Sequence, residues 1–156
     1  MISIVKGKVV KQSTQEKNNY VDVLTNSGVG YRVIVPANLI FSIDSEVTLF
    51  TSFQVREDSQ TLFGFDSEVV RDFFELLITV SGVGPKTGVS VLSTYSMQEV
   101  VGYINEKNHK ELSRVSGLGS KSAQKIIVEL ENRVGEYEGV IGKDKGILKD
   151  LREALT

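Results

Sequence analysis

Two short segments of the chain carry residues that together can bind an anion. Both read hydrophobe-Ser-Gly-hydrophobe-Gly with a lysine two positions after the second glycine, and they lie 35 residues apart, at 80–87 and 115–122. Glycines on either side of an apolar residue allow positive φ angles and a tight bend. We expect each bend to lead into a helix, whose first N–H groups lack intrahelical partners and lie at the positive end of the helix dipole. Such a helix start can bind phosphate.

The two segments resemble the helix-hairpin-helix motif, which holds DNA backbones without reading their sequence. Apolar residues before and after each copy have helical spacing, which agrees with the motif. We assign DNA binding to Gly82, Val83, Gly84, Lys86 and Thr87 in the first copy and to Gly117, Leu118, Gly119, Ser120, Lys121 and Ser122 in the second. The alternatives are a pair of ordinary helical turns with glycine caps, or a protein-interaction module of similar shape.

The overall charge limits how a nucleic acid can be held. The chain has 18 basic and 20 acidic residues and a net charge of −2, and basic residues do not exceed acidic ones in 1–64, 65–135 or 136–156. Many duplex-binding proteins are strongly basic. Binding must therefore come from aimed main-chain amides and a few lysines, and a single protomer should bind weakly. Oligomerisation would multiply such weak sites through effective concentration.

The composition also suggests a compartment and argues against some kinds of site. The chain contains no cysteine, which excludes disulfides and thiolate metal sites and fits a reducing cytoplasm. Its first residues form neither a signal peptide nor a membrane span. The lone His109 lies in a polar stretch and is expected at the surface. We expect a cytoplasmic protein with no metal, no cofactor and no catalytic residue.

The first part of the chain has the pattern of short strands. Runs rich in β-branched and aromatic residues occupy 2–10, 20–24, 30–35, 46–55 and 61–65, with a short helical turn expected near 36–40. Five such strands predict a small barrel of the oligonucleotide-binding (OB) type over 1–64. An SH3-like barrel would give a similar pattern.

From Asp66 the apolar residues take up helical spacing. Ser67 is expected to cap a helix reaching Ile78, and Ser96 with Glu99 has the spacing of a capping box. Asn108 and Glu111 repeat that spacing, and a last helix is expected over about 120–133. The predicted fold class is α+β: the barrel, an all-α tandem hairpin domain over 65–142, and a linker with the first helix of an incomplete C-terminal helical domain over 143–156.

An acidic loop between two apolar strands is the second candidate site. It contains Arg56, Glu57 and Asp58. Polar hairpin loops are common, so a solvated turn is one interpretation. In a DNA-binding protein, adjacent carboxylates would repel phosphates, and this loop would then mark where strands are pushed aside.

The segment 53–65, together with Gly28-Val29-Gly30-Tyr31 and Gly82-Val83-Gly84-Pro85-Lys86, resembles the RuvA family of Holliday-junction-binding proteins over about residues 1–142. The resemblance implies a homotetramer or an octamer that presents a concave face to a four-way junction, with Glu57 and Asp58, beside Arg56, as a central acidic pin. It also implies a role in recombination and repair, including the SOS response. The implied partners are RuvB, a hexameric ATPase that drives the DNA, and the resolvase RuvC.

The chain departs from the family pattern in two places. Position 120 is serine where relatives often carry lysine, which predicts a weaker second hairpin. Family members also continue into a three-helix C-terminal domain that binds the ATPase, of which only the first helix is expected here. We therefore expect junction binding to persist and motor recruitment to fail if these residues are all there is.

Two enzyme readings remain as alternatives. The segment 117–122 faintly resembles a phosphate-binding NTPase loop, but Ser120 splits the required Gly-Lys pair and a helix is expected before it. A base-excision glycosylase with a similar hairpin would need a catalytic carboxylate in a base-flipping pocket, and the sequence shows no such site. A non-catalytic adaptor that uses the hairpins for protein contacts is a third class.

Overall fold

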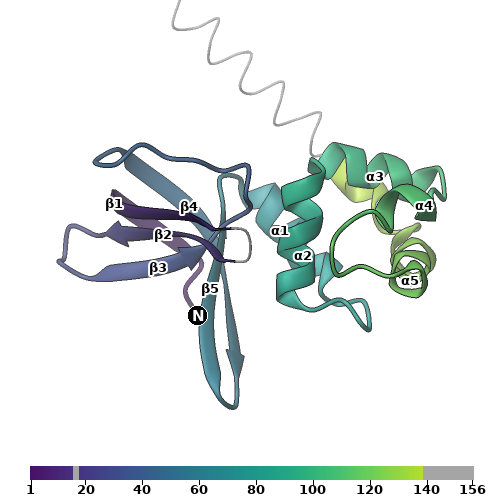
Figure 1. The fold of residues 1–156 in the computed structure, drawn as a ribbon, viewed down its shortest axis with the longest axis horizontal. Coiled ribbons are helices and arrows are strands. Elements are labelled where there is room, and N and C mark those ends of the chain that lie inside the picture. The colour runs from purple at the N-terminus through teal and green to yellow at the C-terminus, as the bar shows by residue number, and fades with distance from the viewer. Residues whose placement is uncertain (16–17, 139–156) are drawn as a thin grey trace, which may run out of the picture.

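The computed structural model describes residues 1–15 and 18–138, in which a β-barrel is followed by a group of short helices (Figure 1). The barrel strands are β1 (Ile4–Gln15), β2 (Asn18–Leu24), β3 (Gly30–Ile34), β4 (Glu46–Arg56) and β5 (Ser59–Phe65). Alternate residues of these strands point inward, and valine and leucine side chains fill the barrel core. This alternation is what half-buried strands require.

The strand order decides between the two barrel types that the sequence allowed. The sheet closes in the order β1-β2-β3-β5-β4, and β1 pairs with both β2 and β4. All pairs are antiparallel except β3 with β5. Closure through the β1–β4 and parallel β3–β5 pairs confirms the OB-like barrel.

Two details of the barrel differ from the prediction. The first two strands were expected over 2–10 and 20–24, but β1 continues to Gln15 and pairs with β2 from Asn18 onward. Thr14 and Gln15 are exposed and Gln12 and Ser13 are only half-buried, so the polar composition of this part of β1 did not indicate a strand. The helical turn expected near 36–40 is a single turn closed by a hydrogen bond of 3.0 Å from Leu39 N–H to the Pro36 carbonyl.

The helices are α1 (Glu68–Leu77), α2 (Pro85–Thr94), α3 (Met97–Asn105), α4 (His109–Leu112) and α5 (Ser120–Leu130). The predicted capping box at Ser96 and Glu99 forms both of its bonds, whereas Ser67 precedes α1 without a side-chain bond. Asn108 caps α4, but the Glu111 carboxylate accepts from the Tyr95 hydroxyl instead of completing a box. The helix expected over about 120–133 ends earlier, at Leu130; residues 131–134 form turns, and one further helical turn follows at 135–138.

The barrel and the helices share apolar and polar contacts. Phe63 and Phe65 of β5 belong to the core of the helical region, with ring centroids 5.5 and 4.8 Å from that of Phe74 in α1. The Arg71 guanidinium, 12% exposed, donates to the carbonyl oxygens of Ser3 and Thr51 in the barrel. These contacts fix α1, and the hairpin after it, relative to the barrel.

The expected linker and C-terminal helix at 143–156 lie outside the described residues. Within residues 1–15 and 18–138, none of the helices combines the length and the apolar content that a membrane crossing requires.

The close packing of α2 on α1 leaves no room for a side chain at Gly88 of α2. A Cβ at Gly88 would lie 2.9 Å from Phe74 Cε2 and 3.1 Å from Ile78 Cγ2. We expect Gly88→Ala to lower the free energy of unfolding in urea, since overpacking costs about 1–3 kcal/mol and exceeds the gain in helix propensity of about 1 kcal/mol. Gly102→Ala in α3, where a Cβ meets nothing within 4 Å, is the control and should be neutral or stabilising. Equal effects of the two substitutions would contradict this account of the helix packing.

Candidate nucleic-acid interface

The two hairpins have the same backbone geometry. Gly82 and Gly117 have φ angles of +90° and +85°, and Gly84 and Gly119 have φ angles of −86° and −77°. In each hairpin the N–H of the apolar residue, Val83 or Leu118, donates over 3.0 Å to a carbonyl three residues earlier. The sequence duplication is therefore a structural duplication.

The apolar residue of each hairpin serves the bend itself. Val83 and Leu118 are 4% and 3% exposed, and their N–H groups are used inside the turn. Their side chains belong to the core of the helical region and anchor the hairpin there. The N–H groups of Val83 and Leu118 are therefore not available to a ligand. These two residues can contribute to DNA binding only through the shape that they give the loop.

The residues after the second glycine have donors to offer. Within the described residues, the N–H groups of Lys86, Thr87, Lys121 and Ser122 form no hydrogen bond, and neither α2 nor α5 has a side-chain cap at its start. Unpaired N–H groups at a helix N-terminus, at the positive end of the dipole, attract anions. The exposed Lys86 and Lys121 side chains add charge beside them.

The two hairpins lie against each other in a reciprocal way. A Cβ at Gly82 would lie 3.5 Å from Ser122 Oγ, and a Cβ at Gly117 would lie 3.9 Å from Thr87 Oγ1. Each hairpin therefore places its first glycine beside the first helical turn of the other. The sequence assigned Thr87 and Ser122 to the interface, but a repeat spacing gives no sign that the copies meet.

A second contact links the two motifs behind the hairpins. The Tyr95 hydroxyl, at the end of α2, donates to the Glu111 carbonyl over 2.9 Å and to its carboxylate over 3.1 Å. Burial, and then the bond to Glu111, raises the pKa of Tyr95, so the hydroxyl remains a donor. The pair of hairpins is held as one unit.

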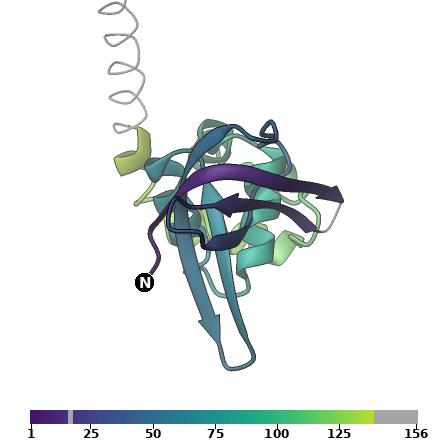
Figure 2. The same cartoon turned by 90° about the vertical axis from the view of Figure 1, so that its left-hand side faces the viewer.

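The acidic loop is the tip of a projecting β-hairpin. β4 and β5 extend beyond the barrel, and the pairing of Arg56 with Ser59 leaves only Glu57 and Asp58 in the turn (Figure 2). The loop is therefore shorter than the interval between the strands expected over 46–55 and 61–65, and Arg56 belongs to β4. Both carboxylates are exposed, and neither forms an ion pair with another described residue.

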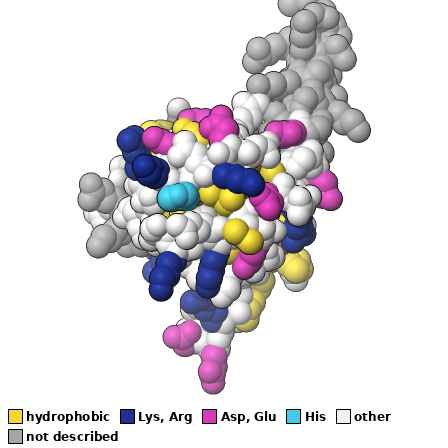
Figure 3. Space-filling model, turned by 90° about the vertical axis from the view of Figure 1, so that its right-hand side faces the viewer, with side chains coloured by type: hydrophobic (Ala, Val, Ile, Leu, Met, Phe, Trp, Pro, Cys, Tyr) yellow, Lys and Arg dark blue, Asp and Glu magenta, His cyan; other side chains and the backbone are white. Residues whose placement is uncertain are grey.

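The acidic tip and the basic side chains are segregated on this part of the surface. In Figure 3, Lys and Arg side chains gather around the base of the projecting hairpin and Asp and Glu side chains occupy its tip. The β4–β5 hairpin and the loop between α1 and α2 extend to the same side of the molecule (Figure 1). Arg56 bridges the two, since its Nη2 lies 3.8 Å from the position of a Cβ at Gly84. Positively charged side chains thus lie beside the first hairpin loop, next to the negatively charged tip.

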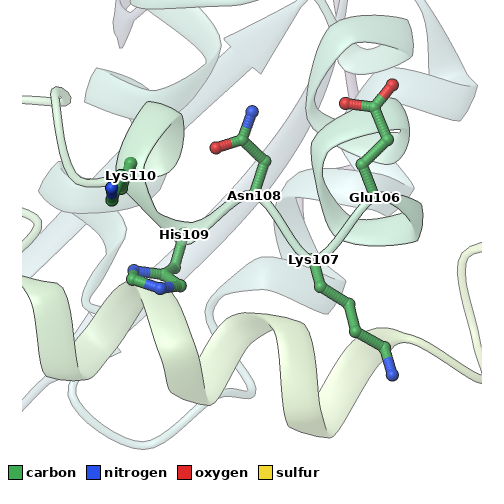
Figure 4. Close-up of a pocket in the computed structure, with 5 residues that line it drawn as sticks. All are labelled: Glu106, Lys107, Asn108, His109 and Lys110. Carbon is green, nitrogen blue, oxygen red and sulfur yellow. The ribbon is translucent and has the colours of Figure 1, made fainter.

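A polar cavity of about 330 Å³ precedes α4, lined by residues 106–110. Its side chains diverge in Figure 4, with Glu106 and Asn108 directed away from Lys107 and His109. The described residues contain no cluster of His, Cys, Asp or Glu suited to a metal ion. The segment before Gly117 is α4 and a turn, so the NTPase-loop alternative lacks its preceding strand.

An OB-like barrel with a projecting acidic hairpin, followed by a tandem helix-hairpin-helix module, defines the class of this protein. Family models match it in the same order: the RuvA N terminal domain at residues 1–64 and the SAM-like helix-hairpin-helix tandem at 74–132. The chain belongs to the RuvA family.

Similar proteins named "Holliday junction branch migration complex subunit RuvA" support the assignment. The protein from Marinobacter nauticus is 35% identical over 142 residues, 89% of this chain and 66% of its own length. The protein from Syntrophotalea carbinolica is 34% identical, and this chain covers 71% of its length. The protein from a Polaromonas species is 36% identical, and this chain covers 82% of its length. This chain thus spans about two thirds to four fifths of these relatives.

The positive φ angle at Gly82 yields a prediction about stability. Gly82→Ala should lower the melting temperature, since an alanine in the left-handed region costs roughly 1–2 kcal/mol. Gly119→Ala is the matched control, because its φ is −77° and a Cβ there meets nothing within 4 Å. A melting temperature as high for Gly82→Ala as for Gly119→Ala would show that the bend does not depend on glycine.

Proposed function

We propose that this chain binds four-way (Holliday) DNA junctions as a homotetramer or as a pair of tetramers. The hairpin amides hold the arm backbones, and the acidic tip separates strands at the crossover. The observation that carries the proposal is the pair of matched hairpins with free N–H groups, on the same side as an unpaired acidic turn. The names of the relatives support the same junction.

Assembly explains how a chain with a net charge of −2 can bind DNA. Each protomer contributes two hairpin sites, and copies around a junction engage several arms at once, so weak contacts add through effective concentration. The same symmetry brings two carboxylates from each copy to the centre. These carboxylates repel DNA phosphates. The DNA backbone is therefore disfavoured at the crossover and is directed outward to the hairpins.

The chain acts in this proposal as a non-catalytic, cytoplasmic DNA-binding subunit in recombination and repair. Strand movement comes from the RuvB ATPase, which the C-terminal domain recruits, and RuvC shares the junction. The names of the relatives, which specify a branch migration complex, support a motor partner. The residues expected to begin the motor-binding domain, 143–156, lie outside the described part of the chain.

The hairpin assignment is tested with Gly84→Asp combined with Gly119→Asp. Each substitution places a carboxylate where phosphate would lie, so the double variant should lose binding to a synthetic four-way junction in a gel-shift assay. The unchanged protein should prefer the junction to linear duplex of the same sequence, with affinity falling steeply as salt rises, because phosphate contacts release counterions.

Gly30→Asp combined with Gly102→Asp is the control, since it adds the same two charges away from the hairpins, at positions where a Cβ meets nothing within 4 Å. Unchanged affinity in a folded double variant would contradict the hairpin assignment. Equal binding of junction and duplex would indicate a general backbone binder, and binding to neither would indicate an adaptor.

The acidic tip is tested by Glu57→Gln with Asp58→Asn. Removing repulsion should preserve or tighten junction binding while reducing strand separation, measured as permanganate reactivity of thymines at the crossover. Asp44→Asn with Glu46→Gln removes the same number of charges at the barrel and should leave reactivity unchanged. A loss of affinity in the tip variant, with normal reactivity, would count against the pin role.

A further inference from the structure

A groove runs between the stem of the acidic hairpin and the start of α2. Its volume is about 570 Å³, within the range of about 300–1,000 Å³ typical of pockets that bind small ligands. It is too small for a duplex and is suited to one nucleotide. The groove lies between the hairpin tip and the first phosphate-binding loop, so a strand passing from one to the other meets it.

The stem side of the groove offers polar groups. Gln54 of β4 and Thr61 of β5 are direct cross-strand partners, so both side chains point to the same face of the hairpin. The Gln54 amide nitrogen donates to Ser52 Oγ over 2.8 Å, and among the described residues its carbonyl oxygen accepts no hydrogen bond. An amide and a hydroxyl on one wall can pair with the edge of a base.

The floor of the groove is apolar and rigid. Ile34 and Phe63 contribute to it, and Phe63 is 3% exposed because its ring packs against Phe74. An apolar floor beside polar edges suits the flat face and polar rim of a nucleobase better than it suits a phosphate.

The phosphate position is set by charge. Arg56 and the exposed Lys86 line the groove from opposite sides, and neither is in an ion pair with a described residue. Asp58 also lines the groove, at its tip end, and repels phosphate there. The favoured place for an anion is the end near Gly84 and Lys86, where the first hairpin offers its free amides.

The groove continues away from the tip. A neighbouring cavity of about 520 Å³ shares Ile34, Phe63 and Lys86 with it and is lined further along by the hydroxyl residues Ser90, Ser93, Thr94 and Ser116. A strand can therefore leave the first groove along α2 toward the second hairpin. Arg71 and the Phe63–Phe74 contact hold both walls in place.

We propose that this groove holds an unpaired nucleotide of a DNA strand that the acidic tip has separated at the crossover, with its base on the Ile34 and Phe63 floor and its phosphate between Arg56 and Lys86. The inference rests on the proposed junction binding. It adds a site for a single strand to the hairpin sites for duplex arms.

Photocrosslinking on the full chain tests whether the groove holds a nucleotide from the crossover. A synthetic four-way junction carries 4-thiothymidine at the crossover or, as a control, in the middle of one arm, and crosslinked residues are located by mass spectrometry. We expect crosslinks to Gln54, Thr61 or Phe63 from the crossover probe alone. Thr61→Phe, which fills the groove, should lower that yield about tenfold, as expected for removing the contacts of one base, and should leave gel-shift binding to the junction intact.

Thr48→Phe makes the same substitution on the outer face of the barrel, where residue 48 is exposed, and should not change the yield. Gln54→Leu, which keeps the size and removes the amide, should also lower the yield and guards against a folding defect in Thr61→Phe. The groove site would be overturned by crosslinks confined to the tip or the hairpins, or by a crosslinking yield that neither groove variant changes. Neither result would contradict junction binding. No preference for the junction in the gel shift would overturn the proposed function and the groove site with it.

Discussion

Each of the two hairpins depends on a bend that glycine adopts at little steric cost. Gly82 and Gly117 have φ angles of +90° and +85°, and each turn leads within three residues into the next helix, α2 or α5. The internal hydrogen bonds from Val83 and Leu118 close each turn, and the groups after the second glycine are left without partners among the described residues. A nearly neutral chain thereby obtains two compact positive sites without a basic surface.

The rest of the structure keeps these sites at fixed positions. Ser122 lies beside Gly82 and Thr87 lies beside Gly117, so each hairpin adjoins the first helical turn of the other. The Arg71 guanidinium and the Phe65–Phe74 pair set the distance between the hairpins and the barrel. Because the acidic tip belongs to the same barrel, its distance from the two hairpins is also fixed, as the proposed binding to one DNA junction requires.

Much of this architecture could be predicted from local patterns. Short stretches of sequence encode the duplicated Gly-hydrophobe-Gly motif, the strands and the capping box at Ser96. In such stretches, backbone preference and periodicity decide the local structure. The polar end of β1 was not predicted, because pairing with β2 stabilises it and its own composition does not. The two-residue tip was missed for the same reason, since cross-strand pairing of Arg56 and Ser59 shortens the loop.

Contacts between distant segments could not be predicted in this way. Nothing in the spacing of the repeats shows that Ser122 meets Gly82, or that Arg56 reaches Gly84. The groove beside Gln54 and Thr61 arises only when the barrel and α2 are placed together. The sequence indicated what each segment could bind. Only the fold shows that the segments combine into one surface.

Amide hydrogen exchange followed by NMR, with and without junction DNA, would show whether the hairpin N–H groups bind the DNA backbone. The N–H groups of Lys86, Thr87, Lys121 and Ser122 should exchange rapidly in the free protein and become protected when the junction is added, since phosphate oxygens would then accept their hydrogen bonds. Slow exchange in the free protein, or protection by DNA that appears elsewhere and spares these amides, would contradict the account.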